Sequence, residues 1–127
     1  MKRSTCISSL CLLGVLMMAP TAFAHEEYKN LKLLADNGET LEKGMKQFSK
    51  GLGVKCNACH VKGKFDSDEK ASKEKARTFF KTVLGTKDKA ARDTALATLL
   101  KDLGQKKASK PDRLWKGIEM LKLKAAK

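Results

Sequence analysis

The chain has 127 residues and a formal net charge of +13, with 42% hydrophobic and 32% charged residues. This length suits a single domain, and the composition is that of a globular protein rather than a disordered or fibrous one. The single Trp and single Tyr argue against an aromatic platform for single-stranded nucleic acid. No apolar run of about 20 residues follows the N-terminal region, which excludes a polytopic membrane protein.

The first 24 residues have the three-part pattern of a secretory signal peptide. Met1-Lys2-Arg3 is basic, an apolar run extends from Ile7 to Ala19, and small residues precede a cleavage site after Ala24. An uncleaved membrane anchor is the alternative, but the run is shorter than the roughly 20 residues that a spanning helix needs. We therefore predict an exported protein whose mature domain is residues 25–127, with a net charge of +11.

The first part of the mature chain predicts a lead-in segment and a helix. Residues 26–35 are expected to be a short helical or irregular segment, closed by the turn signal Asp36-Asn37-Gly38. The apolar residues that follow recur at helical spacing, at Leu41, Met45, Phe48 and Leu52. Thr40 is the expected N-cap of this helix, and Gly51 and Gly53 are the expected stops.

The rest of the chain predicts a loop and three more helices. Residues 61–69 contain a glycine and an Asp-Ser-Asp cluster, which is typical of a loop. Helices are expected over 73–84, from an N-cap at Asp88 to a stop at Gly104, and from Pro111 onward. Their apolar stripes are Ala76, Phe79, Phe80, Val83 and Leu84; Ala91, Ala95, Leu96, Leu99, Leu100 and Leu103; and Leu114, Trp115, Ile118 and Leu121. The pattern predicts one small all-α domain.

The segment Cys56-Asn57-Ala58-Cys59-His60 carries the chemistry, because C-x-x-C-H is the attachment sequence of a c-type haem. Two thiols one helical turn apart add to the two haem vinyl groups, and the next residue, His60, supplies the proximal imidazole. The other ring nitrogen of such a histidine usually donates to a backbone carbonyl. Cys56 and Cys59 are the only cysteines of the mature chain, since Cys6 and Cys11 lie in the signal segment.

Three other interpretations of this motif compete with haem attachment. An exported protein can hold a structural disulfide between Cys56 and Cys59. A thioredoxin-like redox pair also has the C-x-x-C spacing, but it needs a strand–helix–strand context that the sequence lacks. A zinc site needs four ligands, and the mature chain has only four Cys and His residues in all, one of them at its extreme start.

The sixth iron position has several candidate ligands: Met45, Met120, His25, a lysine or solvent. Met45 lies eleven residues before Cys56, on the inner face of a helix that ends just before the motif. Met120 follows His60 by sixty residues, on a predicted helix. A methionine at helical spacing is more often a plain core residue than a ligand. Spacing alone favours Met45 only slightly.

The stretch from Met45 to Phe65 closely resembles a group of small bacterial monohaem cytochromes c. These are similar to single haem segments of the tetrahaem cytochrome subunit of photosynthetic reaction centres. The resemblance extends over Tyr28–Leu84 and includes Tyr28-Lys-Asn-Leu31 and Lys75-Ala-Arg77. It implies a helical domain built around one covalent haem, with the axial methionine on the helix before the motif, where Met45 stands. The chain departs from its relatives at Phe79-Phe80, where they often carry methionines.

These features predict a periplasmic one-electron carrier with a His60/Met45-ligated haem. No acid–base pair, activated nucleophile or phosphate loop is evident, so we do not expect an enzyme. The alternative is a haem enzyme or gas sensor whose sixth ligand is weak or absent. A third is a helical interaction protein without haem that holds a disulfide. Phe48, Phe79, Phe80 and Trp115 are expected to wall the haem or fill the core, and the haem-free chain to be largely unfolded.

The charge indicates the kind of partner. Residues 25–85 carry a net charge of +4 and residues 86–127 carry +7. For an exported protein, an acidic redox protein is the natural partner, with an anionic membrane surface as the alternative, and nucleic acid is not expected. Long-range attraction would accelerate encounter at low salt and fade as salt rises.

Overall fold

The computed structural model describes residues 28–35 and 37–124. The signal segment and His25 lie outside these residues. The described part contains four α-helices: α1 (Glu39–Leu52), α2 (Ala71–Gly85), α3 (Lys89–Asp102) and α4 (Pro111–Glu119), with a 3₁₀ turn, η1 (Cys56–Ala58). It contains no strand, only the isolated bridges Leu34–Leu123 and Val61–Lys64. The predicted all-α class is confirmed.

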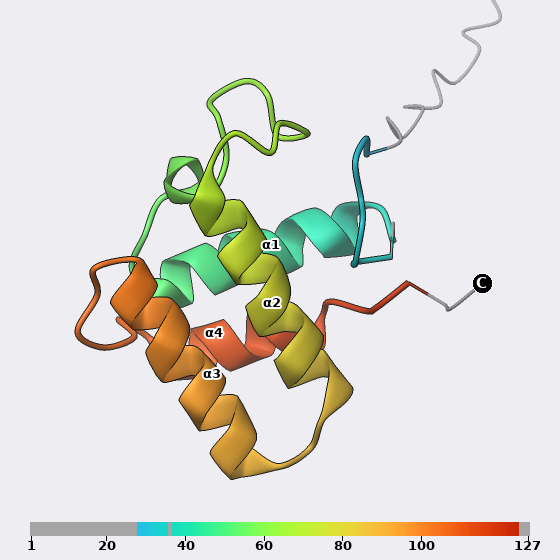
Figure 1. Ribbon diagram of the computed structural model, residues 1–127. Helices are drawn as coiled ribbons and strands as arrows, with labels where there is room; N and C mark the ends of the chain where they lie inside the picture. The colour runs from blue at the N-terminus through green and yellow to red at the C-terminus, as the bar shows by residue number, and fades with distance from the viewer. Residues whose placement is uncertain (1–27, 36, 125–127) are drawn as a thin grey trace, which may run out of the picture.

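The helices pack as two pairs, α1 with α4 and α2 with α3 (Figure 1). The chain that leaves α4 returns to the lead-in segment. There the backbone N–H of Ala35 donates to Lys122 at 2.8 Å, and that of Lys124 donates to Leu33 at 2.8 Å. These bonds hold residues 28–35 in an irregular, extended course, which settles the helical-or-irregular alternative of the sequence.

Two glycines allow the backbones of α1 and α4 to approach closely. A Cβ added at Gly51 would lie 2.4 Å from atoms of Leu114, and one added at Gly117 would lie 2.6 Å from the amide nitrogen of Phe48. Gly51 is therefore a buried contact residue inside α1, and its expected role as a helix stop is wrong. Gly53 does end the helix: its φ is +85° and its N–H donates to Ser49 at 3.0 Å.

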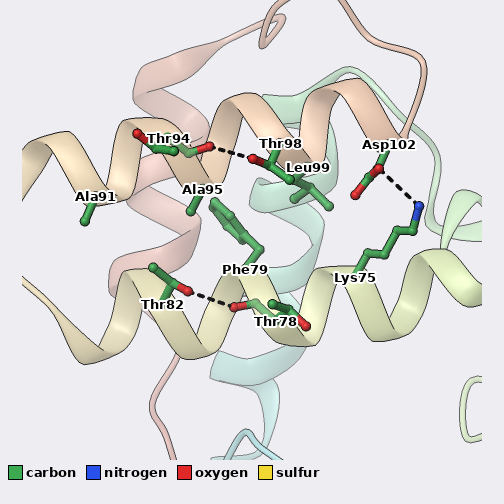
Figure 2. A pocket seen from close by; sticks show the side chains of 10 residues that line it. All are labelled: Lys75, Thr78, Phe79, Thr82, Ala91, Thr94, Ala95, Thr98, Leu99 and Asp102. Atoms are coloured by element: carbon green, nitrogen blue, oxygen red, sulfur yellow. Dashed lines mark hydrogen bonds and ion pairs between the residues drawn. The ribbon is translucent and has the colours of Figure 1, made fainter.

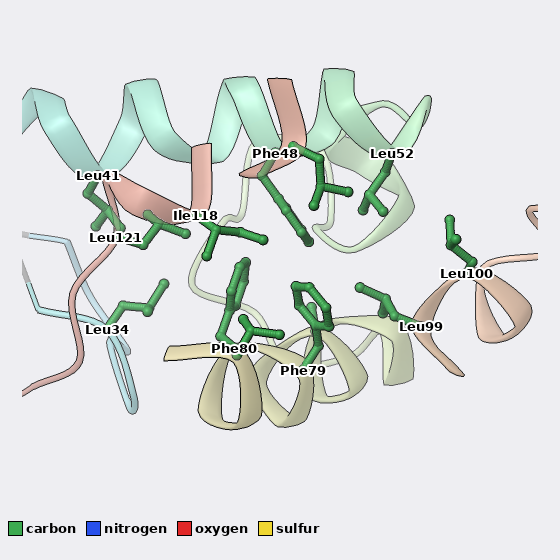
Figure 3. Packing of buried hydrophobic residues seen from close by; sticks show 13 residues of the cluster. Leu34, Leu41, Phe48, Leu52, Phe79, Phe80, Leu99, Leu100, Ile118 and Leu121 are labelled. Carbon is green, nitrogen blue, oxygen red and sulfur yellow. The ribbon is translucent and has the colours of Figure 1, made fainter. Parts of the chain in front are cut away.

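The core consists of thirteen buried apolar residues drawn from the lead-in segment, all four helices and the chain after α4 (Figure 3). At its centre the ring of Phe48 lies 5.7 Å from that of Phe79 and 4.7 Å from that of Phe80. These aromatic residues fill the core, which was one of their two expected roles. The helices α1 and α2 thus share an apolar contact directly, through these three rings.

The helix boundaries follow the sequence signals in part. Asp88 caps α3, since its carboxylate accepts from the N–H of Ala91 at 3.1 Å, and Pro111 opens α4 as expected. Thr40 lies inside α1, whose N-cap is Gly38. Leu121 is buried although it follows the end of α4. Among the described residues, none of the helices has the length and apolar character to cross a membrane.

Candidate functional site

The C-x-x-C-H segment forms a tight turn between α1 and α2. The carbonyl of Cys56 accepts from the N–H of Cys59 at 3.3 Å and from that of His60 at 3.0 Å. The start of α2 fixes the outer side of this turn. The Ser72 hydroxyl donates to the Ala58 carbonyl at 2.6 Å, and the Lys70 ammonium group donates to the carbonyl of Asn57. The turn therefore lies against the N-terminal end of α2 (Figure 1).

Both thiols of the turn are free. Cys56 is exposed, whereas Cys59 is half-buried and packs against the core. Burial raises the pKa of the Cys59 thiol, which the neighbouring Ser72 and Lys70 partly oppose. The hydroxyl of Ser49, on the last turns of α1, lies 4.0 Å from the Cys56 sulfur. The Cys56 thiol thus lies beside the end of α1, and the Cys59 thiol lies beside the start of α2.

His60 is half-buried, and its Nδ1 lies 3.2 Å from the backbone carbonyl oxygen of Phe65. A carbonyl can only accept, so this contact places the proton on Nδ1 and leaves the lone pair of Nε2 for a metal. Burial lowers the pKa of His60, the bond to Phe65 partly opposes this, and the charges of Lys73, Arg77 and Lys70 lower the pKa further. The imidazole therefore favours the neutral form, which is the form that ligates iron.

A polar network holds the loop that follows His60. Lys32, Arg77 and Lys73 surround the carboxylate of Asp68, with N–O distances of 2.6, 2.9 and 3.2 Å. Lys32 foremost, then Asn30, Lys73 and Arg77, keep the pKa of Asp68 well below its usual range. The sequence predicted this segment only as a loop, because the cations come from the lead-in segment and from α2.

Met45 lies half-buried on α1, against the core. It is four residues before Ser49, the residue that contacts Cys56, so both lie along the same edge of the helix. This edge also bounds the cysteine turn. The structure thus brings Met45 and the motif to one side of α1.

Met120 lies at the opposite end of α1. It is the half-buried C-cap of α4 rather than a mid-helix residue, and its carbonyl accepts from the Asn37 side chain at 3.3 Å. Asn37 precedes the first residue of α1, whereas the motif follows the last, and a helix of 14 residues is about 20 Å long. His25, the other candidate named above, lies outside the described residues.

The side chains around the turn suit a covalently attached haem. Two free thiols stand one turn apart, and the histidine that follows has Nδ1 engaged and Nε2 available. A disulfide is not formed between Cys56 and Cys59. Within residues 28–35 and 37–124, no three Cys, His, Asp or Glu side chains converge as a metal-ion site requires. The zinc interpretation therefore has no ligand set in this part of the chain.

An open groove of about 500 Å³ lies between α2 and α3 (Figure 2). Phe79 and Leu99 form its base, and an ion pair between Lys75 and Asp102 closes one end. The hydroxyls of three of its threonines, Thr78, Thr82 and Thr98, donate to carbonyls of their own helices. The groove thus lacks the converging polar groups that fix a ligand, and the motif turn is the better candidate site.

Comparisons with protein-family models, with curated proteins and with solved structures gave no match to this chain. The resemblance to small monohaem cytochromes c therefore rests on the residues of this chain alone.

Proposed function

We propose that this protein is a c-type cytochrome that carries single electrons. Cys56 and Cys59 would bind one haem covalently, with His60 and Met45 as its axial ligands. The observation that carries the proposal is the bond between His60 Nδ1 and the Phe65 carbonyl, directly after two free thiols. That bond fixes the tautomer and the ring orientation that a proximal ligand needs.

The residues of the turn have separate tasks in this proposal. Each thiol would add its S–H across one vinyl C=C bond, sulfur to one carbon and hydrogen to the other, which needs no oxidant and releases nothing. The haem supplies the one-electron Fe(III)/Fe(II) couple. His60 presents Nε2, and its Nδ1–H stays bonded to the chain. The half-buried Met45 thioether, as a soft neutral ligand, favours the ferrous form.

Ligation by Met45 would distinguish an electron carrier from the alternative, a haem enzyme or gas sensor. If Met45 held the iron together with His60, substrates and gases would have no open coordination site. A haem enzyme or gas sensor needs that site free or weakly held. Support for the carrier comes from the placement of Met45 on the edge of α1 that bounds the cysteine turn.

The proposed partner is an acidic redox protein in the periplasm, reached after cleavage of residues 1–24. No acidic residue lies between Ser49 and Phe65, and four exposed lysines do: Lys50, Lys55, Lys62 and Lys64. None of these four has an ion-pair partner among the described residues. This local positive charge surrounds the motif. The larger excess of residues 86–127 comes mainly from residues 103–110 and 120–127, with three lysines each, since α3 carries a net charge of +1 and α4 none.

The decisive experiment is maturation of the chain with and without a cytochrome c assembly system. We expect a mature chain that begins at His25, with a mass raised by one whole haem. Its colour should survive denaturation and acid–acetone extraction. The matched control is the Cys56→Ser/Cys59→Ser variant, which should release any haem it binds. An unmodified wild-type chain with a Cys56–Cys59 disulfide would overturn the proposal.

A further inference from the structure

Lys73 is the one charged residue that is buried in the described part of the chain, at 8% exposure. Its ammonium group has three N–H donors. They meet the carbonyl of Phe65 at 2.9 Å, the carbonyl of Ser67 at 2.9 Å and the carboxylate of Asp68 at 3.2 Å. The cation is therefore fully bonded, and each of its partners belongs to the loop that follows the haem motif.

The Phe65 carbonyl accepts from two donors at once. One is Lys73 Nζ at 2.9 Å and the other is His60 Nδ1 at 3.2 Å. A carbonyl oxygen has two lone pairs, so both bonds are possible together. The shorter bond comes from the charged donor, which is the stronger of the two kinds. The histidine thus shares its acceptor with a buried cation.

We propose that Lys73 is a positioning residue for His60: it fixes the Phe65 carbonyl that accepts from the imidazole, and by sharing that carbonyl it raises the reduction potential of the bound haem. This inference rests on the proposed function. Lys73, which follows His60 by thirteen residues, would thus help to set the equilibrium between the ferric and ferrous forms.

Two effects of Lys73 act in the same direction. A strong bond from Nδ1–H to its acceptor makes the imidazole a better electron donor, which stabilises ferric iron. Lys73 draws on the same carbonyl, weakens that bond and so disfavours the ferric form. Its positive charge also disfavours the ferric form, because that form carries one more positive charge than the ferrous form.

Replacement of Asp68 should shift the reduction potential in the direction opposite to replacement of Lys73. The carboxylate of Asp68 partly neutralises Lys73, so its replacement by asparagine leaves the cation less compensated. If charge and the shared carbonyl set the reduction potential, the potential should fall in Lys73→Met and rise in Asp68→Asn. Simple loosening of the loop would move both variants the same way, since each removes a contact that holds it.

The experiment compares four holoproteins: the wild type, Lys73→Met, Asp68→Asn and the control Lys75→Met. Lys75 lies on the same helix, but it pairs with Asp102 of α3 at 3.1 Å rather than with the loop. The mass of each protein reports haem attachment, and a spectroelectrochemical titration at neutral pH gives its potential. Lys73→Met should shift the ferric–ferrous equilibrium about threefold to tenfold toward ferric, a fall of about 30 to 60 mV for one electron.

Asp68→Asn should raise the potential, and Lys75→Met should change it by less than half as much as Lys73→Met. An unchanged or raised potential in Lys73→Met overturns the inference, as does a fall in both loop variants. If Lys73→Met yields no holoprotein, Asp68→Asn decides: a rise supports the inference and any other result overturns it. A wild type without covalent haem is a different outcome, since it overturns the proposed function itself.

Discussion

Replacement of Met45 by leucine tests whether this methionine, rather than Met120, is the proposed iron ligand. Met45→Leu removes the sulfur and keeps nearly the same volume against the core. The ferric holoprotein should then lose the weak far-red absorption band of a methionine–iron bond, bind added imidazole or cyanide readily, and have a lower reduction potential. Met120→Leu is the matched control and should change none of these properties.

The structure sets the size of the accompanying stability change. Both methionines are half-buried, and a volume-conserving exchange of this kind costs less than about 1.5 kcal/mol. For a domain of this size that cost lowers the melting temperature by at most about 10 °C. The packing change alone therefore leaves each variant folded at room temperature. A circular dichroism spectrum with the helical content of the wild type shows that the spectral loss in Met45→Leu reports ligation rather than unfolding.

Absorption spectra of the ferric proteins, with and without added imidazole, make the measurement. If only Met120→Leu loses the band, the ligand follows the motif, as in ordinary small cytochromes c, and the placement of Met120 beside Asn37 would have to change in the holoprotein. If neither variant loses a band, the sixth position belongs to another group or to solvent. The haem-enzyme or gas-sensor alternative would then replace the carrier.

Three further predictions concern stability. Gly51→Ala should lower the free energy of unfolding by about 1 to 3 kcal/mol in a denaturant titration, because its Cβ would lie 2.4 Å from α4; Gly85→Ala, with no atom within 4 Å, should leave it equal or raise it by up to about 1 kcal/mol. Asp68 has a depressed pKa in the folded state, so its contribution is present above its ordinary pKa of about 4 and is lost as pH falls below that value. The melting-temperature difference between the wild type and Asp68→Asn should therefore shrink on acidification from pH 5 to about pH 2, and a constant difference would contradict this assignment. The Cys56→Ser/Cys59→Ser protein should retain a helical circular dichroism spectrum and a cooperative melt, since neither cysteine is among the thirteen buried core residues. A largely unfolded chain would contradict this and agree with the expectation drawn from the sequence.

The helices were predictable because apolar periodicity and end signals agree along most of the chain. Asp88 at the start of α3 and Pro111 at the start of α4 act locally, and both hold in the structure. The misassigned glycine, Gly51, shows where this reasoning fails. A glycine after an apolar stripe has the same appearance whether it ends a helix or admits a neighbouring backbone. Only the position of Leu114, more than sixty residues later, distinguishes the two.

The motif is visible in the sequence itself, because C-x-x-C-H lies within five consecutive residues, and the haem attachment that it indicates stays a prediction. Its support was only partly predictable. A carbonyl partner for His60 was expected in general terms, but no sequence signal identified Phe65 as that partner. Nothing in the sequence indicated the burial of Lys73. It lies in the first turn of a predicted helix, close to other lysines, and such a lysine is normally solvated. Its burial depends on a loop that bends back onto α2.

The core and the site are therefore stabilised by different forces. The apolar faces of the helices hold α1 and α2 together through Phe48. The loop after the motif has an exposed aromatic ring, Phe65, and no buried apolar residue, so hydrophobic packing cannot fix it. Buried or partly screened charge does so instead, through Lys73 and Asp68. Since the same ammonium group also bonds the acceptor of His60, the interaction that orders this loop sets the environment of the proposed iron ligand. We therefore expect a change to the loop's charges to alter the reduction potential of the proposed haem, whereas a change to the core should alter stability alone.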